Sequence, residues 1–96
     1  MILDITPLAK LDIVEIYQFS KVEWGASRAR RYANDLLGRL KALAIGQLSG
    51  QSADDVTAGL RRQVSGAHVI WFRHKTDRVL IIRILHQSRD VGRWLG

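Results

Sequence analysis

The stretch RILHQSRDVGRW, residues 83–94, places three arginines, a histidine and a tryptophan directly after an apolar, strand-like run. Guanidinium and imidazole groups can hold a phosphate, and an imidazole can also move a proton. Metal-free cleavage of RNA through its own 2′-hydroxyl needs such a base, an acid and cations. The same residue types suit a surface that binds an acidic macromolecule. Three interpretations are therefore open: a nuclease site, an interaction surface or a charged chain end.

Other chemistries find little support in the sequence. The histidines are His68, His74 and His86, and the first two would lie about 20 Å apart on one strand, too far to share an ion. The chain has no HExxH motif, P-loop or GxGxxG fingerprint, and no cysteine. We therefore expect neither a metal nor a cofactor.

Strand geometry limits the nuclease hypothesis. In a regular last strand one face would carry Leu80, Ile82, Ile84 and His86, and the other Val79, Ile81, Arg83 and Leu85. Arg83 and His86 would then point apart, so His86 could be joined only by Arg89 and an arginine of a neighbouring strand. Arg83 has a structural alternative, which is to pair with Asp90 or to cap a helix end.

The net charge of +6 is unevenly distributed. Residues 1–60 hold seven Lys or Arg and seven Asp or Glu, whereas residues 61–96 hold eight basic residues against two acidic ones. This asymmetry indicates an anionic partner, either nucleic acid or an acidic protein segment, although a solvated basic face would look the same. Ninety-six residues without a long apolar run or a signal sequence predict one cytoplasmic domain, residues 1–96.

The helical elements are predicted from periodicity and from capping residues. MILDI reads as a short strand, and Thr6-Pro7 is a favoured helix start. Helices are expected over residues 7–23 and 26–44, separated by Trp24-Gly25 and folded into an antiparallel hairpin. The first helix carries a second apolar set, so we expect it to pack on two sides; that set is Leu8, Leu11, Val14 and Phe19.

The second half reads as a β region. Residues 45–59 have the composition of a loop, and three strands follow within residues 60–86, with tight connections at Ser65-Gly66 and residues 75–77. A basic tail ends the chain. The order β-α-α-β-β-β predicts an α+β fold, in which a helical hairpin packs on one face of a mainly antiparallel sheet.

Four segments together resemble a known family. They are TPLAKLDIVEIYQFSKVEWG, ARRYANDLLGRLKALA, GLRRQVSGAHVIWFRHK and VLIIRILHQSRD. They resemble the ParE branch of the RelE/ParE superfamily, the toxins of bacterial type II toxin–antitoxin pairs. The resemblance covers nearly the whole chain, is weakest over residues 45–57, and implies the same α+β fold.

The resemblance implies one of two activities. ParE-type members inhibit DNA gyrase and block replication, whereas RelE-type members cut messenger RNA on the ribosome. By position, the ribonuclease residues would be Arg62, His86 and Arg89. The terminal tyrosine of RelE-type enzymes is missing, since Val91-Gly92-Arg93-Trp94 stands there, and the helical Tyr17 and Tyr32 are not expected to replace it. This favours a gyrase inhibitor with no catalytic residues.

The resemblance also implies partners. We expect a cognate ParD-like antitoxin of the ribbon-helix-helix type, bound as a hetero-oligomer, with an inactive antitoxin-binding module as a further alternative. The residues expected to bind the target are Arg83, His86, Arg89, Arg93 and Trp94. The residues expected to bind the antitoxin are Arg61, Trp71 and Arg73.

Overall fold

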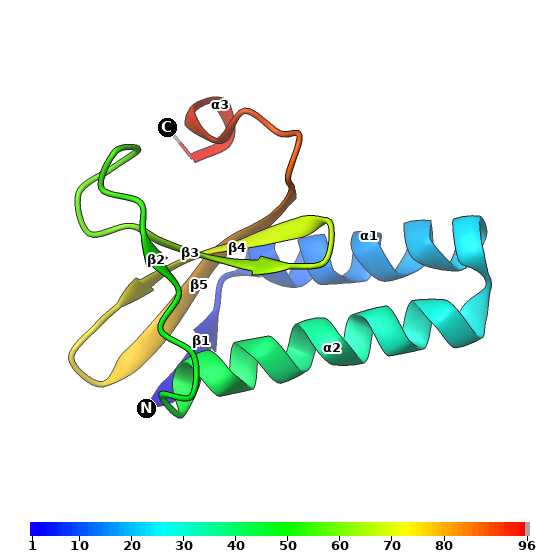
Figure 1. Ribbon diagram of the computed structural model, residues 1–96, viewed down its shortest axis with the longest axis horizontal. Helices are drawn as coiled ribbons and strands as arrows, with labels where there is room; N and C mark the ends of the chain where they lie inside the picture. The colour runs from blue at the N-terminus through cyan, green and yellow to red at the C-terminus, as the bar shows by residue number, and fades with distance from the viewer. Residues whose placement is uncertain (96) are drawn as a thin grey trace.

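The computed structural model describes residues 1–95. The elements in chain order are β1 (Ile2–Ile5), α1 (Pro7–Trp24), α2 (Ala26–Ala44), β2 (Gln51–Ser52), β3 (Arg61–Ser65), β4 (His68–His74), β5 (Arg78–His86) and α3 (Val91–Leu95). The predicted α+β order is confirmed. The two additions are β2, inside the expected loop, and α3, inside the expected tail. Figure 1 shows the hairpin of α1 and α2 extending to the right beyond the sheet, and α3 above the sheet.

The ends of the helices follow the predicted capping residues. The Thr6 hydroxyl accepts a hydrogen bond from the Ala9 N–H at 3.1 Å and donates one to the Ile82 carbonyl at 2.8 Å. Thr6 therefore caps α1 and also ties its start to β5. At the other end Gly25 has a φ of 89°, which separates α1 from α2.

The sheet has the order β1-β5-β4-β3-β2. Its pairs are antiparallel except β1–β5, which is parallel. The β4–β5 ladder contains a bulge, because Trp71 pairs with Arg83 but Phe72 pairs with Ile81, and Ile82 has no opposite residue.

The bulge overturns the predicted alternation along β5. Val79 and Ile81 lie on the face that packs against the helices, but so does Ile84, whereas Ile82 and Leu85 lie on the outer face. One extra residue reverses the face of every side chain that follows it. The prediction that Ile82 and Ile84 share a face is therefore wrong.

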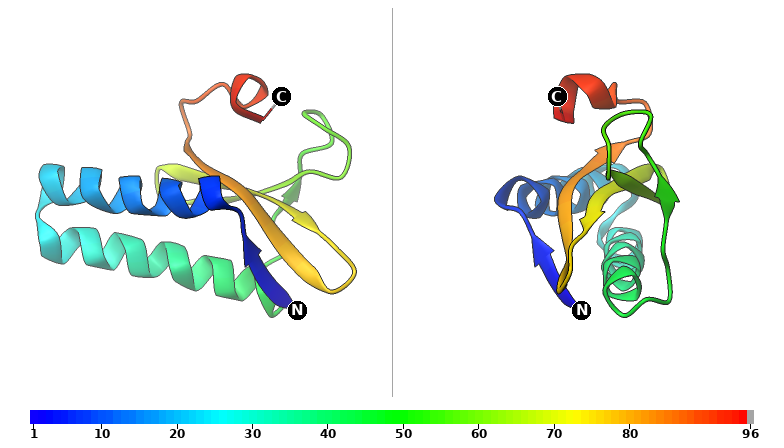
Figure 2. Two further views of the ribbon diagram at one scale, coloured as in Figure 1. Left: turned by 180° about the vertical axis from the view of Figure 1, so that it is seen from behind. Right: turned by 90° about the vertical axis from the view of Figure 1, so that its left-hand side faces the viewer.

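Each face of the sheet is covered by a different layer. The main core lies between the sheet and the two helices, and its large buried side chains include Leu36, Leu40 and Phe72. A smaller cluster around Leu60, Trp71 and Leu85 lies on the outer face, under the loop before β3 and under α3. Figure 2 shows α3 and this loop on the side of the sheet away from the hairpin.

The helix α1 packs on one side only. Its buried residues are Ala9, Asp12, Ile16 and Ser20. The predicted second apolar side, from Leu8 to Phe19, is exposed by 50 to 64%, so the expectation of two-sided packing is wrong. None of the helices within residues 1–95 has the length and apolarity needed to cross a bilayer.

Two glycines give opposite predictions for substitution by alanine. Gly38 lies inside α2 with no atom near the position of a new Cβ, so Gly38→Ala should stabilise the protein by about 0.5–1 kcal/mol. Gly50 has a φ of 65°, and its Cβ would lie 2.6 Å from the Arg62 carbonyl oxygen. Gly50→Ala should therefore destabilise by about 1–3 kcal/mol. Urea unfolding of both variants checks the pair, and shifts of the same sign would contradict the assigned backbone geometry.

Candidate functional site

A groove of about 640 Å³ lies between α1 and the end of β5, and it contains most of the predicted target-binding residues. We call it the α1–β5 groove. Its polar and aromatic lining comprises Asp12, Glu15, Phe19, Ser20 and Trp24 on one side and His68, Arg83, His86, Ser88, Arg89 and Trp94 on the other. Of the predicted set, only Arg93 lies outside the lining. One wall of the groove therefore comes from α1, and the other comes from the C-terminal third of the chain.

The centre of the groove is an ion pair that the sequence did not predict. The Asp12 carboxylate accepts hydrogen bonds from Arg83 Nε at 2.8 Å and from its terminal nitrogen at 2.9 Å. It also accepts the Ile84 backbone N–H at 2.9 Å. Arg83 therefore does have a structural partner, but this is Asp12 and not Asp90, which caps the start of α3 by accepting the Gly92 N–H.

A cation–aromatic cluster forms the C-terminal edge of the groove. The guanidinium of Arg89 lies 4.5 Å from the centre of the Trp94 ring, and that of Arg83 lies 5.5 Å from it. Such contacts contribute roughly 0.5–1 kcal/mol at exposed sites. Arg89 and Arg93 are exposed and Trp94 is 41% exposed, so this edge remains available to a partner.

Two histidines meet at the other edge of the groove. His68 and His86 pair across β4 and β5, and their ring centres lie 5.5 Å apart. The Ser88 N–H donates to His86 Nδ1, so the neutral His86 ring carries its proton on Nε2. Tyr32, which we did not expect to replace the missing terminal tyrosine, brings its hydroxyl within 2.6 Å of His68 Nδ1.

The Tyr32 hydroxyl also contacts backbone groups of the β3–β4 turn. It accepts the Ala67 N–H at 2.9 Å and lies 3.2 Å from the Ser65 carbonyl. A Cβ at Gly66 would lie 2.7 Å from this hydroxyl, so the β3–β4 turn closes directly onto it. Tyr32 therefore fixes the turn that presents His68 to the groove.

The three residues of the alternative ribonuclease site are not brought together. Arg62 pairs with Trp71 across β3 and β4, which places it on the outer face of the sheet. His86 pairs with His68 and so points to the face that carries Ser65 and the helices. Arg89 lines the groove, but its guanidinium lies against Trp94.

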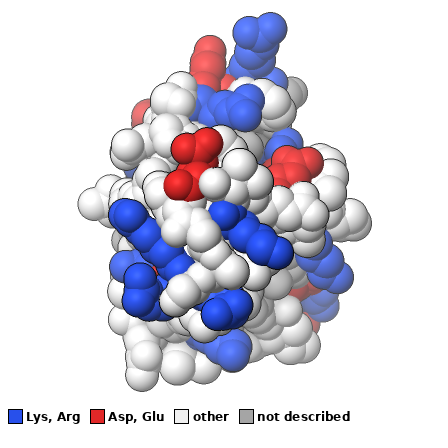
Figure 3. All heavy atoms as spheres, turned by 90° about the vertical axis from the view of Figure 1, so that its right-hand side faces the viewer, with Lys and Arg blue, Asp and Glu red and all other residues white. Residues whose placement is uncertain are grey.

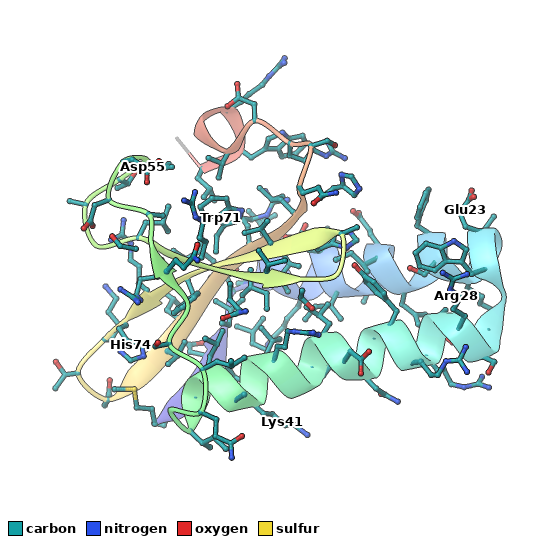
Figure 4. All side chains as sticks on the ribbon, in the orientation of Figure 1. Glu23, Arg28, Lys41, Asp55, Trp71 and His74 are labelled. Carbon is teal, nitrogen blue, oxygen red and sulfur yellow. The ribbon has the colours of Figure 1, made fainter. Side chains whose placement is uncertain are left out.

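The three residues predicted to bind the antitoxin have structural contacts in the described chain. Arg61 donates to the carbonyls of Ser49 and Gly50, and Arg73 donates to that of Ala58. Both side chains therefore hold the loop before β3. Trp71 is only 6% exposed and points toward the side of that loop and α3, as Figure 4 shows.

The sequence held one overlooked signal for this site. Asp12 falls at a helical spacing between Ala9 and Ile16, both of which are buried. A carboxylate on the buried face of a helix requires a cationic or N–H partner, and this signal could have identified the pair with Arg83. No comparable signal marks Tyr32, because its contact with His68 depends on how the hairpin packs on the sheet.

The positive charge is spread beyond the groove. Figure 3, which looks onto the tip of the helical hairpin, shows Lys and Arg side chains over much of this face and a further group at the top, where α3 lies. At the tip itself, Arg28 lies over the ring of Trp24 at 4.8 Å. Within residues 1–95 no three His, Cys, Asp or Glu side chains are grouped so that they could hold a metal ion.

His68 should make the stability depend on pH. Burial lowers the pKa of His68 below its ordinary value of 6.5, and the neighbouring His86 lowers that pKa further. As the pH falls, His68 therefore takes up a proton in the unfolded chain before it does so in the folded chain. The resulting loss of folding stability is absent above pH 6.5 and grows as the pH falls below it. Urea unfolding between pH 7.5 and 5.5 should give a smaller loss of stability for His68→Gln than for the wild type. An unchanged slope in His68→Gln would contradict the assignment.

Comparison with known proteins agrees with this architecture. The family model that describes the ParE toxin of the type II toxin–antitoxin system parDE matches residues 3–91. The chain is similar to toxin ParE1 of Caulobacter vibrioides, with 39% identity over 92% of this chain and 91% of the relative. It is also similar to toxin ParE of Escherichia coli, with 26% identity over 91% of this chain and 85% of the relative.

A solved structure supports the same grouping. A chain of the chromosomal ParDE toxin–antitoxin system from P. aeruginosa superposes with a TM-score of 0.77 and 26% identity, over 90% of this chain and 95% of that chain. The order of elements, the mixed sheet and the sequence matches therefore agree, and the chain belongs to the ParE toxin family of type II toxin–antitoxin systems.

Proposed function

We propose that the free protein inhibits DNA gyrase, without catalysing a reaction of its own, and so blocks replication. The observation that carries this proposal is the cation–aromatic cluster of Arg83, Arg89 and Trp94, with Arg93 exposed beside it. Arginine and tryptophan are the residue types most often found at the energetic centres of protein interfaces. Membership of the ParE family supports gyrase as the target, and a gyrase inhibitor would act in the cytoplasm.

The arrangement of the basic residues favours binding over RNA cleavage. General acid–base catalysis requires its groups within hydrogen-bonding reach of one substrate, and Arg62 and His86 point to opposite faces of the sheet. The guanidinium of Arg83 is also neutralised by Asp12. His68 and His86 could still supply an acid and a base, so a ribonuclease remains the alternative that an experiment must test.

An antitoxin of the ParD-like, ribbon-helix-helix type is the proposed second partner. The uncovered side of α1, with Leu11 51% and Val22 84% exposed, offers apolar area beside the groove. Carboxylates of an antitoxin segment would be attracted to the basic C-terminal third. Arg61 and Arg73 are partly exposed and remain proposed contacts, whereas the buried Trp71 could contribute only if its covering segments moved.

A supercoiling assay with antitoxin-free protein tests the proposal. Purified gyrase should lose supercoiling activity as the toxin is added, while messenger RNA on translating ribosomes stays intact. Arg89→Ala removes one of the two cations on Trp94, so it should raise the toxin concentration needed for half-inhibition by about fivefold to tenfold. The matched control is Lys41→Ala, because Lys41 lies on the far side of the molecule in Figure 4 and carries the same charge.

The assay also separates the alternatives. Cut RNA with normal supercoiling would replace the proposal with a RelE-like ribonuclease, in which His86→Ala should abolish cleavage. If neither supercoiling nor RNA is affected while antitoxin binding is retained, the protein would be an inactive antitoxin-binding module. Equal losses for Arg89→Ala and Lys41→Ala would show that general charge, and not the cluster, drives binding.

A further inference from the structure

The position of α3 needs an explanation, because a helix of five residues is not stable alone. Its contacts with the rest of the protein must hold it in place. Val91 and Leu95 pack on the outer cluster of the sheet, and Trp94 lies against Arg83 and Arg89. Of these contacts, only the one with Arg83 leads directly to the helical hairpin.

The Arg83 side chain is itself immobilised. Two of its nitrogens donate to the Asp12 carboxylate, and the side chains of Arg83 and Asp12 are 14% and 8% exposed. A planar guanidinium held by two parallel hydrogen bonds has a fixed orientation. The Trp94 ring therefore contacts both the immobilised guanidinium of Arg83 and the exposed guanidinium of Arg89.

We propose that Asp12 is a positioning residue for the target-binding surface: it holds Arg83, and Arg83 holds Trp94 and with it α3. This inference rests on the proposed function only in its last step, in which the placed Trp94 binds gyrase. We first expected Arg83 to contact the target directly. It acts here through Trp94, because its guanidinium is paired with Asp12 and its side chain is mostly buried.

The indole N–H signals of Trp24, Trp71 and Trp94 in a nuclear magnetic resonance spectrum provide the test. Single Trp→Phe variants assign the three signals. Asp12→Asn removes the negative charge but keeps an oxygen that can accept the Ile84 N–H. It should move the Trp94 signal toward that of an unfolded chain and speed its exchange with water by at least fivefold. The Trp24 signal should stay in place, because Trp24 lies twelve residues beyond Asp12 along α1, which is about 18 Å at the helical rise.

Asp4→Asn is the matched control. Asp4 also pairs with an arginine of β5, Arg78, at 3.1 Å, but both side chains are about two-fifths exposed, and Arg78 is the first residue of β5, at the opposite end of the strand from α3. Asp4→Asn should therefore leave the Trp94 signal, its exchange rate and gyrase inhibition unchanged. Asp12→Asn should reduce gyrase inhibition at least as much as Trp94→Ala.

A double variant keeps the test decisive if Asp12→Asn fails to fold. Asp12→Asn combined with Arg83→Met leaves no unpaired buried charge and preserves the apolar stem, so the protein should fold with the Trp94 signal displaced. A Trp94 signal and exchange rate equal to the wild type, in whichever variant is folded, would overturn the inference. A displaced signal in a protein whose wild type leaves gyrase active would uphold the positioning role and reject only the target.

Discussion

The Asp12 carboxylate accepts three hydrogen bonds inside the interface between α1 and β5, and the C-terminal third is arranged around them. The strand β5 continues beyond the end of β1, so on that side no strand of residues 1–95 accepts the Ile84 N–H, and the Asp12 carboxylate accepts it instead. Burying a charge is costly unless it is paired and hydrogen-bonded, and losing one partner of a buried pair typically costs about 3–5 kcal/mol. The pair therefore fixes where α1 crosses the sheet and gives Trp94 a rigid surface on which to rest.

The parts of the fold that local chemistry determines could be predicted from the sequence. Thr6 caps α1, Gly25 separates the helices and Gly66 closes the β3–β4 turn, each through its own backbone or side chain. The bulge at Ile82 could not be predicted, because it depends on how β5 is matched to β4 on one side and to β1 and α1 on the other. The two-residue strand β2 likewise forms only because β3 is there to pair with it.

The sequence indicated which segment of the chain forms the candidate site, but not how its side chains contact one another. Four of the five residues predicted to bind the target, Arg83, His86, Arg89 and Trp94, line one groove. The contacts within it join distant parts of the chain, such as Tyr32 with His68 and Asp12 with Arg83, and pairings of that kind leave no local pattern. The apolar side of α1 was read as a second core face because apolar residues at helical spacing look the same in a sequence whether they are buried or exposed.

Asp12 and Arg83 stabilise the protein as a pair, and a double-mutant cycle measures this coupling directly. The free energy of unfolding in urea would be determined for the wild type, Asp12→Ala, Arg83→Ala and the double variant. We expect a favourable coupling of about 2 kcal/mol, since the two side chains are in contact and largely buried. A coupling below about 0.5 kcal/mol would mean that the two side chains act independently, and the arrangement of the groove and of α3 would need another cause.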